Sequence, residues 1–185
     1  MTLIGHLRTT ARANRLANHR LHGAMAGLSA ADFQAPRTSF FPSLAATANH
    51  ILAVDIYYLA ALRGEADMAA QYLRFAPCAD VPRLAARQRA IDERLIRHVE
   101  GLGEADLDAE IAMDRGDRIQ IDRAGHVLAH LFNHQVHHRG QLHAMLAGTA
   151  IAPPQLDEFL MPSEAALRAA DLQALGWREA DLFVG

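Results

Sequence analysis

The sequence predicts an all-α protein: a four-helix bundle with a small β-hairpin before its last long helix and a short helix near the C-terminus. Three observations support this fold class. Of the 185 residues, 51% are hydrophobic and only 6% are aromatic, and the apolar positions are rich in Ala and Leu, which favour helices. Four long segments repeat apolar residues at helical spacing. The prolines fall at the edges of these segments or between them.

The first two predicted helices cover residues 3–28 and 44–63. The first repeats leucine at helical intervals and ends in a new polar turn. Ser43 is a candidate N-cap for the second helix, and Gly64 is a candidate stop signal. His50 lies in the second turn of this helix, within the apolar stretch "NHILAV".

A third amphipathic helix is expected from Val81 to the glycines at 101 and 103, where apolar and charged residues alternate at helical spacing. The next stretch, residues 107–122, alternates apolar residues on both sides of "DRGD", which predicts a β-hairpin.

Two more helices complete the predicted fold. Asp122 is a candidate N-cap for a fourth long helix over residues 123–147, which is expected to end at Gly148. Ser163 is a candidate cap for a short helix over residues 163–175. The length suits a single domain spanning residues 1–185.

Charge and cysteine content narrow the possible functions. The net charge of −3 is spread without a basic run, so we expect no nucleic-acid partner. The N-terminal segment lacks the apolar core of a signal peptide, and no stretch free of polar residues is long enough to predict a membrane span. Cys78, the only cysteine, lies in a proline-flanked connector and is expected to be an incidental thiol in a reducing cytoplasm.

Six of the eleven histidines fall on the fourth helix, at positions 126, 130, 134, 137, 138 and 143. Histidines four residues apart share a helix face, with a drift of about 40° per step, so each adjacent pair could present two imidazoles to one metal ion. Three such pairs exist, and spacing alone does not choose among them. A third ligand would come from a facing helix, where His50 is the candidate, whereas His19 and His22 lie among polar residues typical of a solvated face.

Polar surface is the alternative interpretation of these histidines. A zinc-metalloprotease site is excluded, because the zincin motif needs Glu after its first histidine and here Gln135 follows His134. Gly140 is a further clue, since glycine within a helix costs about 1 kcal/mol relative to alanine. Either close packing of another helix, the more common reason, or room beside a ligand would explain Gly140.

The segment "NHQVHHRGQLHAML" resembles the HxxxHRGQ signature of the DinB/YfiT-like family of metal-binding four-helix-bundle proteins. The upstream "ANHILAVDIYYL" is similar to the histidine-bearing second helix of that family, and the hairpin and "PPQLDEFL" also resemble its pattern. The resemblance covers most of the chain in order.

The resemblance implies that His50, His134 and His138 bind a divalent metal, zinc, nickel or iron, with positions left open for water or substrate. His126, His130, His137 and His143 would then flank the site, with His130 near enough to line its pocket. Dimerisation is common in the family, so a homodimer is expected.

Characterised members of this family resemble metal-dependent thiol enzymes, so the resemblance implies a cytoplasmic metalloenzyme, a hydrolase or a small-thiol S-transferase that activates water or a low-molecular-weight thiol. The alternative is a non-catalytic, stress-associated protein that binds metal or ligand. Tyr57, Tyr58, the first helix and the region near Trp177 are candidates for the substrate pocket, although core packing explains each of them equally well.

Overall fold

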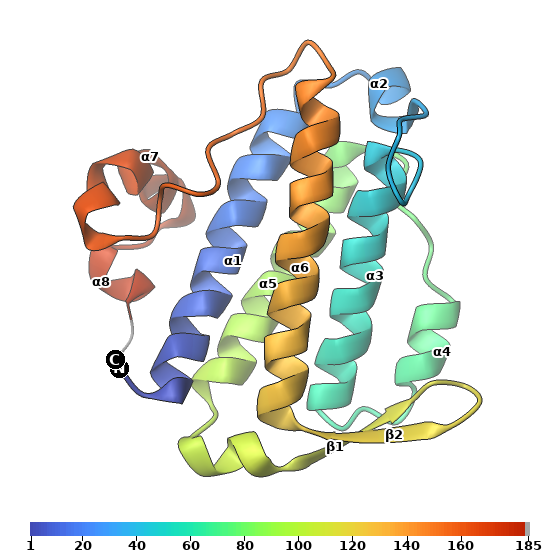
Figure 1. The fold of residues 1–185 in the computed structure, drawn as a ribbon, viewed down its shortest axis with the longest axis vertical. Coiled ribbons are helices and arrows are strands. Elements are labelled where there is room, and N and C mark those ends of the chain that lie inside the picture. Colours follow the sequence, from blue (N-terminus) through green and yellow to red (C-terminus); the bar gives the residue numbers. More distant parts are fainter. Residues whose placement is uncertain (184–185) are drawn as a thin grey trace.

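The computed structural model describes residues 1–183 and contains four long helices side by side. These are α1 (Leu3–Met25), α3 (Leu44–Leu62), α5 (Val81–Glu100) and α6 (Ala124–Ala147). Helices α1 and α6 run in one direction and α3 and α5 in the other, and each packs against two neighbours (Figure 1). The predicted all-α bundle is confirmed, and α3 and α6, which carry the candidate histidines, are adjacent.

Side-chain caps and glycines set the ends of these helices. The Ser43 hydroxyl accepts a hydrogen bond from the backbone N–H of Ala46 at 3.0 Å, as predicted, and Asp80 caps α5 in the same way through Arg83. Gly64 follows α3 with φ +66°, a conformation that favours glycine.

The structure corrects two predicted caps. Asp122 lies in strand β2 (Ile119–Arg123) and accepts a hydrogen bond from Gln120, so Arg123 occupies the N-cap position of α6 without a side-chain cap. Ser163 lies within a short 3₁₀ turn (Pro162–Glu164) instead of capping the C-terminal helix. The first helix also ends three residues early, at Met25.

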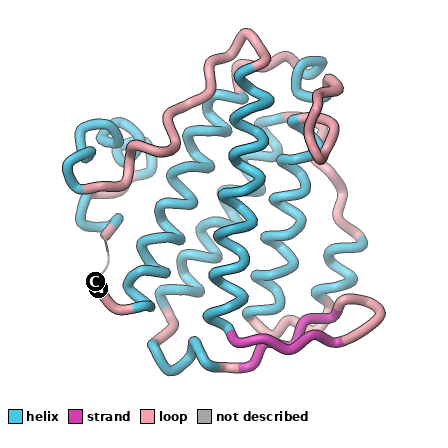
Figure 2. Tube along the Cα trace, in the orientation of Figure 1, coloured by secondary structure: helices cyan, strands magenta, loops and turns pink. Residues whose placement is uncertain are grey.

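The predicted hairpin is present and lies across one end of the bundle (Figure 2). Strand β1 (Glu110–Asp114) pairs antiparallel with β2, with Ala112 opposite Ile121, after a 3₁₀ turn (Glu104–Asp108). Gly116, at φ +89°, makes the turn. The hairpin brings Arg115 back beside α3, where its Nη2 donates to the Tyr58 hydroxyl at 3.0 Å.

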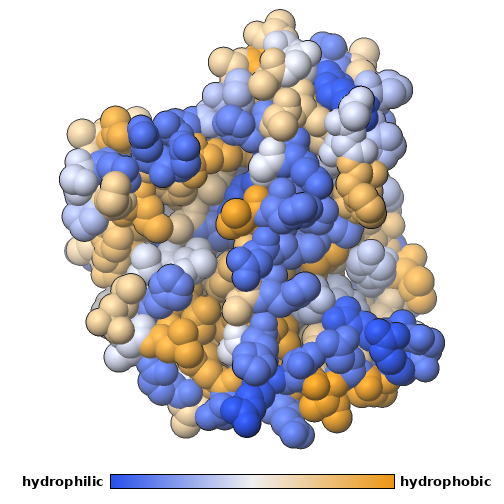
Figure 3. Space-filling view, viewed as in Figure 1, coloured by the Kyte–Doolittle hydropathy of each residue, from blue (hydrophilic) through white to orange (hydrophobic). Residues whose placement is uncertain are grey.

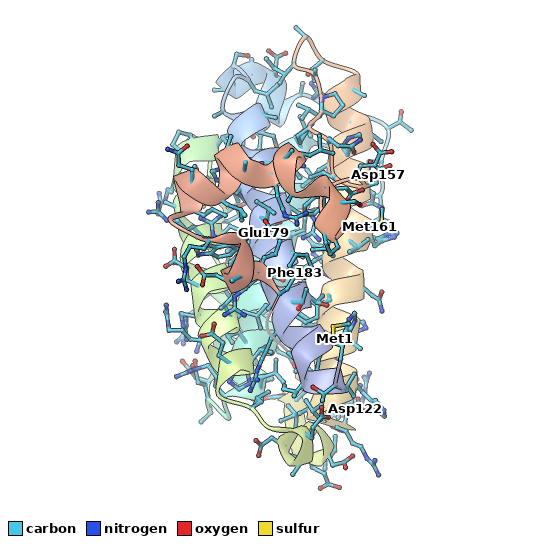
Figure 4. The ribbon with its side chains drawn as sticks, turned by 90° about the vertical axis from the view of Figure 1, so that its left-hand side faces the viewer. Met1, Asp122, Asp157, Met161, Glu179 and Phe183 are labelled. Atoms are coloured by element: carbon cyan, nitrogen blue, oxygen red, sulfur yellow. The ribbon has the colours of Figure 1, made fainter. Side chains whose placement is uncertain are left out.

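The C-terminal segment folds against α1 (Figure 4). Helices α7 (Ala165–Leu175) and α8 (Glu179–Leu182) are held together by Arg168, which is fully buried. Its guanidinium pairs with Glu179 and donates to the backbone oxygen of Phe159 at 2.8 Å. Two further short helices, α2 (Ala30–Gln34) and α4 (Met68–Leu73), were not predicted, and neither was α8.

Cys78 lies in the predicted connector and is buried in the core, where its backbone N–H donates to Asn49 at 2.6 Å. Burial corrects the predicted surroundings of His22. His22 is partly buried, and burial lowers its pKa to about 3, so it does not lie on a solvated face. Helix α3 is long and apolar enough to cross a membrane, but it is the core helix of this bundle, with 78% of its apolar window buried.

Candidate metal centre

His50, His134 and His138 meet between α3 and α6. His50 comes from the second turn of α3, and the other two histidines come from consecutive turns of α6. Nε2 of His50 lies 2.9 Å from Nε2 of His134, and one ligand atom from each of the three rings lies within 4.8 Å of the others. The structure thus brings together the one pair of the histidine series that the resemblance implied, with the predicted partner from α3.

Burial keeps these imidazoles neutral. Desolvation, with a smaller effect of His138, lowers the pKa of His50 to about 4. Desolvation and the neighbouring histidines lower the pKa of His134 to about 3, and the pKa of His138 is also lowered, mainly by burial. Neutral imidazoles have the free lone pairs that a metal ion requires.

The geometry and the donor set both fit a divalent metal. Nitrogens bound at the usual distance of 2.0–2.1 Å in a tetrahedral site lie about 3.4 Å apart. This value falls between the 2.9 Å that separates Nε2 of His50 from Nε2 of His134 and the 4.8 Å within which all three ligand atoms lie. Imidazole nitrogen suits zinc, nickel and iron. Nε2 of His134 faces His50, and its Nδ1 is buried without a hydrogen-bond partner among residues 1–183.

Two residues orient and enclose the cluster. Nδ1 of His138 lies 2.8 Å from Oε1 of Gln141, which places the proton on Nδ1 and leaves Nε2 free for a metal. The ring of Phe41, from the loop before α3, packs against His50 with 4.2 Å between centroids. Gln141 is part of the quoted "HRGQ" motif, whereas no sequence signal pointed to Phe41.

The remaining histidines of α6 do not join the group of possible ligand atoms among the described residues. His126 and His137 are exposed, and the ring of His137 packs against that of His138 with 4.8 Å between centroids. His130 is exposed one turn before His134, with 6.4 Å between ring centroids. Nε2 of His143 lies 3.0 Å from the backbone oxygen of Pro154, on another side of the helix.

A pocket of about 400 Å³ opens beside the cluster and is lined by both His130 and His134. Tyr57 and Tyr58 also line it, which fits their predicted role, whereas Trp177 packs against the core elsewhere. Arg115 from the hairpin completes one wall, with its guanidinium carbon 5.3 Å from the centroid of each tyrosine ring. The sequence did not indicate that Arg115 would reach this place.

The fold, the hairpin and the three histidines can now be compared with known proteins. A family model described as the DinB family matches residues 4–172, nearly the whole chain. The chain belongs to the DinB family. The match includes every element that builds the histidine cluster and its pocket in this DinB-family protein. A search of curated proteins gave no match.

Proposed function

We propose that this DinB-family protein is a metal-dependent enzyme in which His50, His134 and His138 hold zinc, nickel or iron and a low-molecular-weight thiol is activated at the open position. The main support is the number of ligands. Among residues 1–183 no carboxylate or thiolate joins the three imidazoles. Structural zinc sites are usually closed by four protein ligands, whereas catalytic sites keep a position open.

A bound divalent metal would supply a Lewis acid that lowers the pKa of a thiol or water molecule in its open position. The histidines contribute by remaining neutral, since a low pKa means that protons do not compete for their lone pairs. Gln141 holds the ring of His138 in the tautomer that such a site needs.

The adjoining pocket gives the second reactant a place to bind. Tyr57, Tyr58 and Tyr72 form aromatic walls, so a substrate with an apolar or planar part would fit there. Nη1 of Arg115 makes no hydrogen bond among the described residues and can bind an anionic group of the substrate. His130 is positioned to exchange a proton with a molecule in this pocket.

The test is a screen of protein purified without an affinity tag and reconstituted with zinc, nickel or iron. Several small thiols are each paired with electrophilic acceptors, and ester substrates without thiol test the hydrolase alternative. We expect thiol-dependent turnover that His134→Ala abolishes and that the exposed control His126→Ala retains.

Two results would contradict the thiol-transferase proposal. Turnover of esters without any thiol would make the protein a hydrolase that activates water. If fully metal-loaded protein turned over none of the substrates, the result would favour the non-catalytic alternative, a metal- or ligand-binding protein.

A further inference from the structure

A hollow of about 730 Å³ lies on the opposite side of α6 from the histidine cluster. Helix α1, helix α6 and the segment 153–160 enclose it, and we call it the α1–α6 hollow. Val136 faces this hollow and is displaced by about 200° around the helix from His134. Figure 3 shows apolar surface beside the polar front of α6, on the side of the C-terminal segment.

The walls of the hollow are mostly apolar and fixed in place. Val136 is 62% exposed, and Phe132 and Phe159 line the same space. The outer wall is anchored by His143, whose Nε2 lies 3.0 Å from the Pro154 oxygen, and by Arg20, which donates to the Gln155 oxygen at 2.8 Å. The size and lining match those of small-molecule sites.

Gly140 keeps this space open. A Cβ atom added at Gly140 would meet nothing within 4 Å, so the packing explanation for this glycine, favoured from the sequence, is wrong. Gly140 lines the hollow and lies within α6, where glycine costs about 1 kcal/mol relative to alanine. Of the two explanations for Gly140, room beside a ligand is the one that the structure leaves.

Arg139 supplies a charge at the base of the hollow. The residue is only 8% exposed, and its Nη1 donates to Asn14, Asn18 and Gln135. Its Nε and Nη2 make no hydrogen bond among residues 1–183 and keep some exposed surface, and Arg139 is one of the residues that line the hollow.

The guanidinium of Arg139 is not paired directly with a carboxylate. No carboxylate accepts a hydrogen bond from it among the described residues, although Asp92 and Asp55 lie close enough to interact with its charge. The acidic residue of the lining, Asp157, is exposed to solvent. A buried cation that has unpartnered donors and no hydrogen-bonded carboxylate can accept an anion.

We propose that the α1–α6 hollow is a second binding site, separate from the histidine cluster, for a small monocarboxylate with an apolar tail. The carboxylate would accept hydrogen bonds from Nε and Nη2 of Arg139, and the tail would lie along Val136 and Phe159 beside the space left by Gly140.

Isothermal titration calorimetry of the metal-loaded protein with octanoate and with 1-octanol tests this proposal. We expect one octanoate per chain, bound at least about tenfold more tightly than the uncharged alcohol, because hydrogen bonds to a charged group contribute more than neutral ones. Gly140→Leu, which fills the hollow, should weaken octanoate binding by about tenfold or more. The control Ala129→Leu adds the same side chain at an exposed position of α6 eleven residues before Gly140, outside the lining of the hollow, and should bind like the wild type.

Two further measurements keep the result specific. Gly140→Leu should melt no lower than the wild type, since leucine favours the helix, so lost binding cannot be attributed to unfolding. His134→Ala should bind octanoate as the wild type does, because the site does not use the histidine cluster. Octanoate binding to His134→Ala therefore distinguishes a site in the α1–α6 hollow from a site at the metal centre.

Equal affinity for octanoate and octanol, or unchanged octanoate binding in Gly140→Leu, would overturn the proposal. Loss of octanoate binding in His134→Ala would assign the carboxylate to the metal centre instead. If neither compound binds and Gly140→Leu splits a dimer in light scattering, the hollow is an interface between two copies of the chain and the proposal is wrong.

Discussion

Two groups of polar side chains interrupt the apolar bundle, and α6 contributes to both from neighbouring positions. The first is the histidine cluster of His50, His134 and His138. The second, here called the polar layer, draws residues from all four long helices. Its members are Asn14, Asn18, Asp55, Gln88, Asp92, Gln135 and Arg139.

The two groups differ in the kinds of side chain that they bring together. In the polar layer, Gln88 donates to both Asp55 and Asp92, and Nδ2 of Asn18 donates to Asp92 at 3.1 Å. Both groups contain buried atoms without a partner among the described residues, Oδ1 of Asp55 and Nε2 of Gln135 in the polar layer and Nδ1 of His134 in the histidine cluster. The polar layer connects the helices through donors and acceptors of different kinds, whereas the histidine cluster gathers three rings of the same kind, whose lone pairs suit a metal ion.

The largest expected effect is on stability, from breaking the polar layer. Asp92→Ala removes the acceptor shared by Asn18 and Gln88 and leaves nearby Arg139 less compensated. We expect a loss of about 3–5 kcal/mol in the free energy of unfolding, measured by urea denaturation. The adjacent exposed control Glu93→Ala should stay within about 0.5 kcal/mol of the wild type.

If Asp92→Ala lowered the free energy of unfolding no more than Glu93→Ala does, the polar layer would not hold the helices together. Metal binding provides the second readout. Folded Asp92→Ala at low temperature should still bind one metal ion, because Asp92 does not contact the histidines.

A smaller effect is expected from Gln141→Ala, which removes the hydrogen-bond partner of Nδ1 of His138. Loss of such a partner typically weakens metal binding about 10–100-fold, measurable by competition with a chelator. Asn133→Ala, at an exposed position of the same helix, is the control and should leave the affinity unchanged. Equal affinities for these two variants would mean that Gln141 does not orient the ring.

The smallest expected effect is that of pH on metal affinity. Because the pKa values of His50 and His134 lie at about 4 and about 3, both rings stay neutral at pH 5. We therefore expect His50 and His134 to add almost no pH dependence to the metal affinity between pH 7 and pH 5. Three histidines with the ordinary pKa of about 6.5 would lose more than about a thousandfold over this range.

The same shifts fix the sign of the stability change in metal-free protein. Below about pH 6.5 the unfolded chain binds protons at His50 and His134, whereas the folded chain does not. The free energy of unfolding therefore falls as the pH is lowered from about 6.5 towards 4 and 3, and this loss is absent above pH 6.5. Asp92 has the opposite sign, because its pKa is raised to about 6. Its protonation in the folded state stabilises the protein as the pH falls from about 6 to 4.

Local sequence patterns predicted the long helices and the hairpin well, because helical periodicity, Ser43 and the terminal glycines are short-range signals. The N-cap of α6 was wrong because pairing in β2 holds Asp122 in the strand. Helices α2, α4 and α8 were missed because four to six residues carry too little periodicity to detect.

The candidate site was only partly predictable. Spacing left three histidine pairs open, and the resemblance to the DinB/YfiT-like family selected His134 and His138. Phe41 and Arg115 reach the site from a loop and a hairpin turn, whose paths depend on how the ends of the bundle pack. The polar layer joins residues as distant as Asn14 and Arg139, and such long-range pairs leave no local signal.

The most direct test of the account is the metal content of protein purified without an affinity tag, measured by mass spectrometry for the wild type and for single-histidine variants. We predict one divalent ion per chain in the wild type and in His126→Ala, and almost none in His50→Ala or His134→Ala. A wild type without stoichiometric metal, or unchanged metal content in the last two variants, would contradict the claim that the histidine cluster is a metal centre.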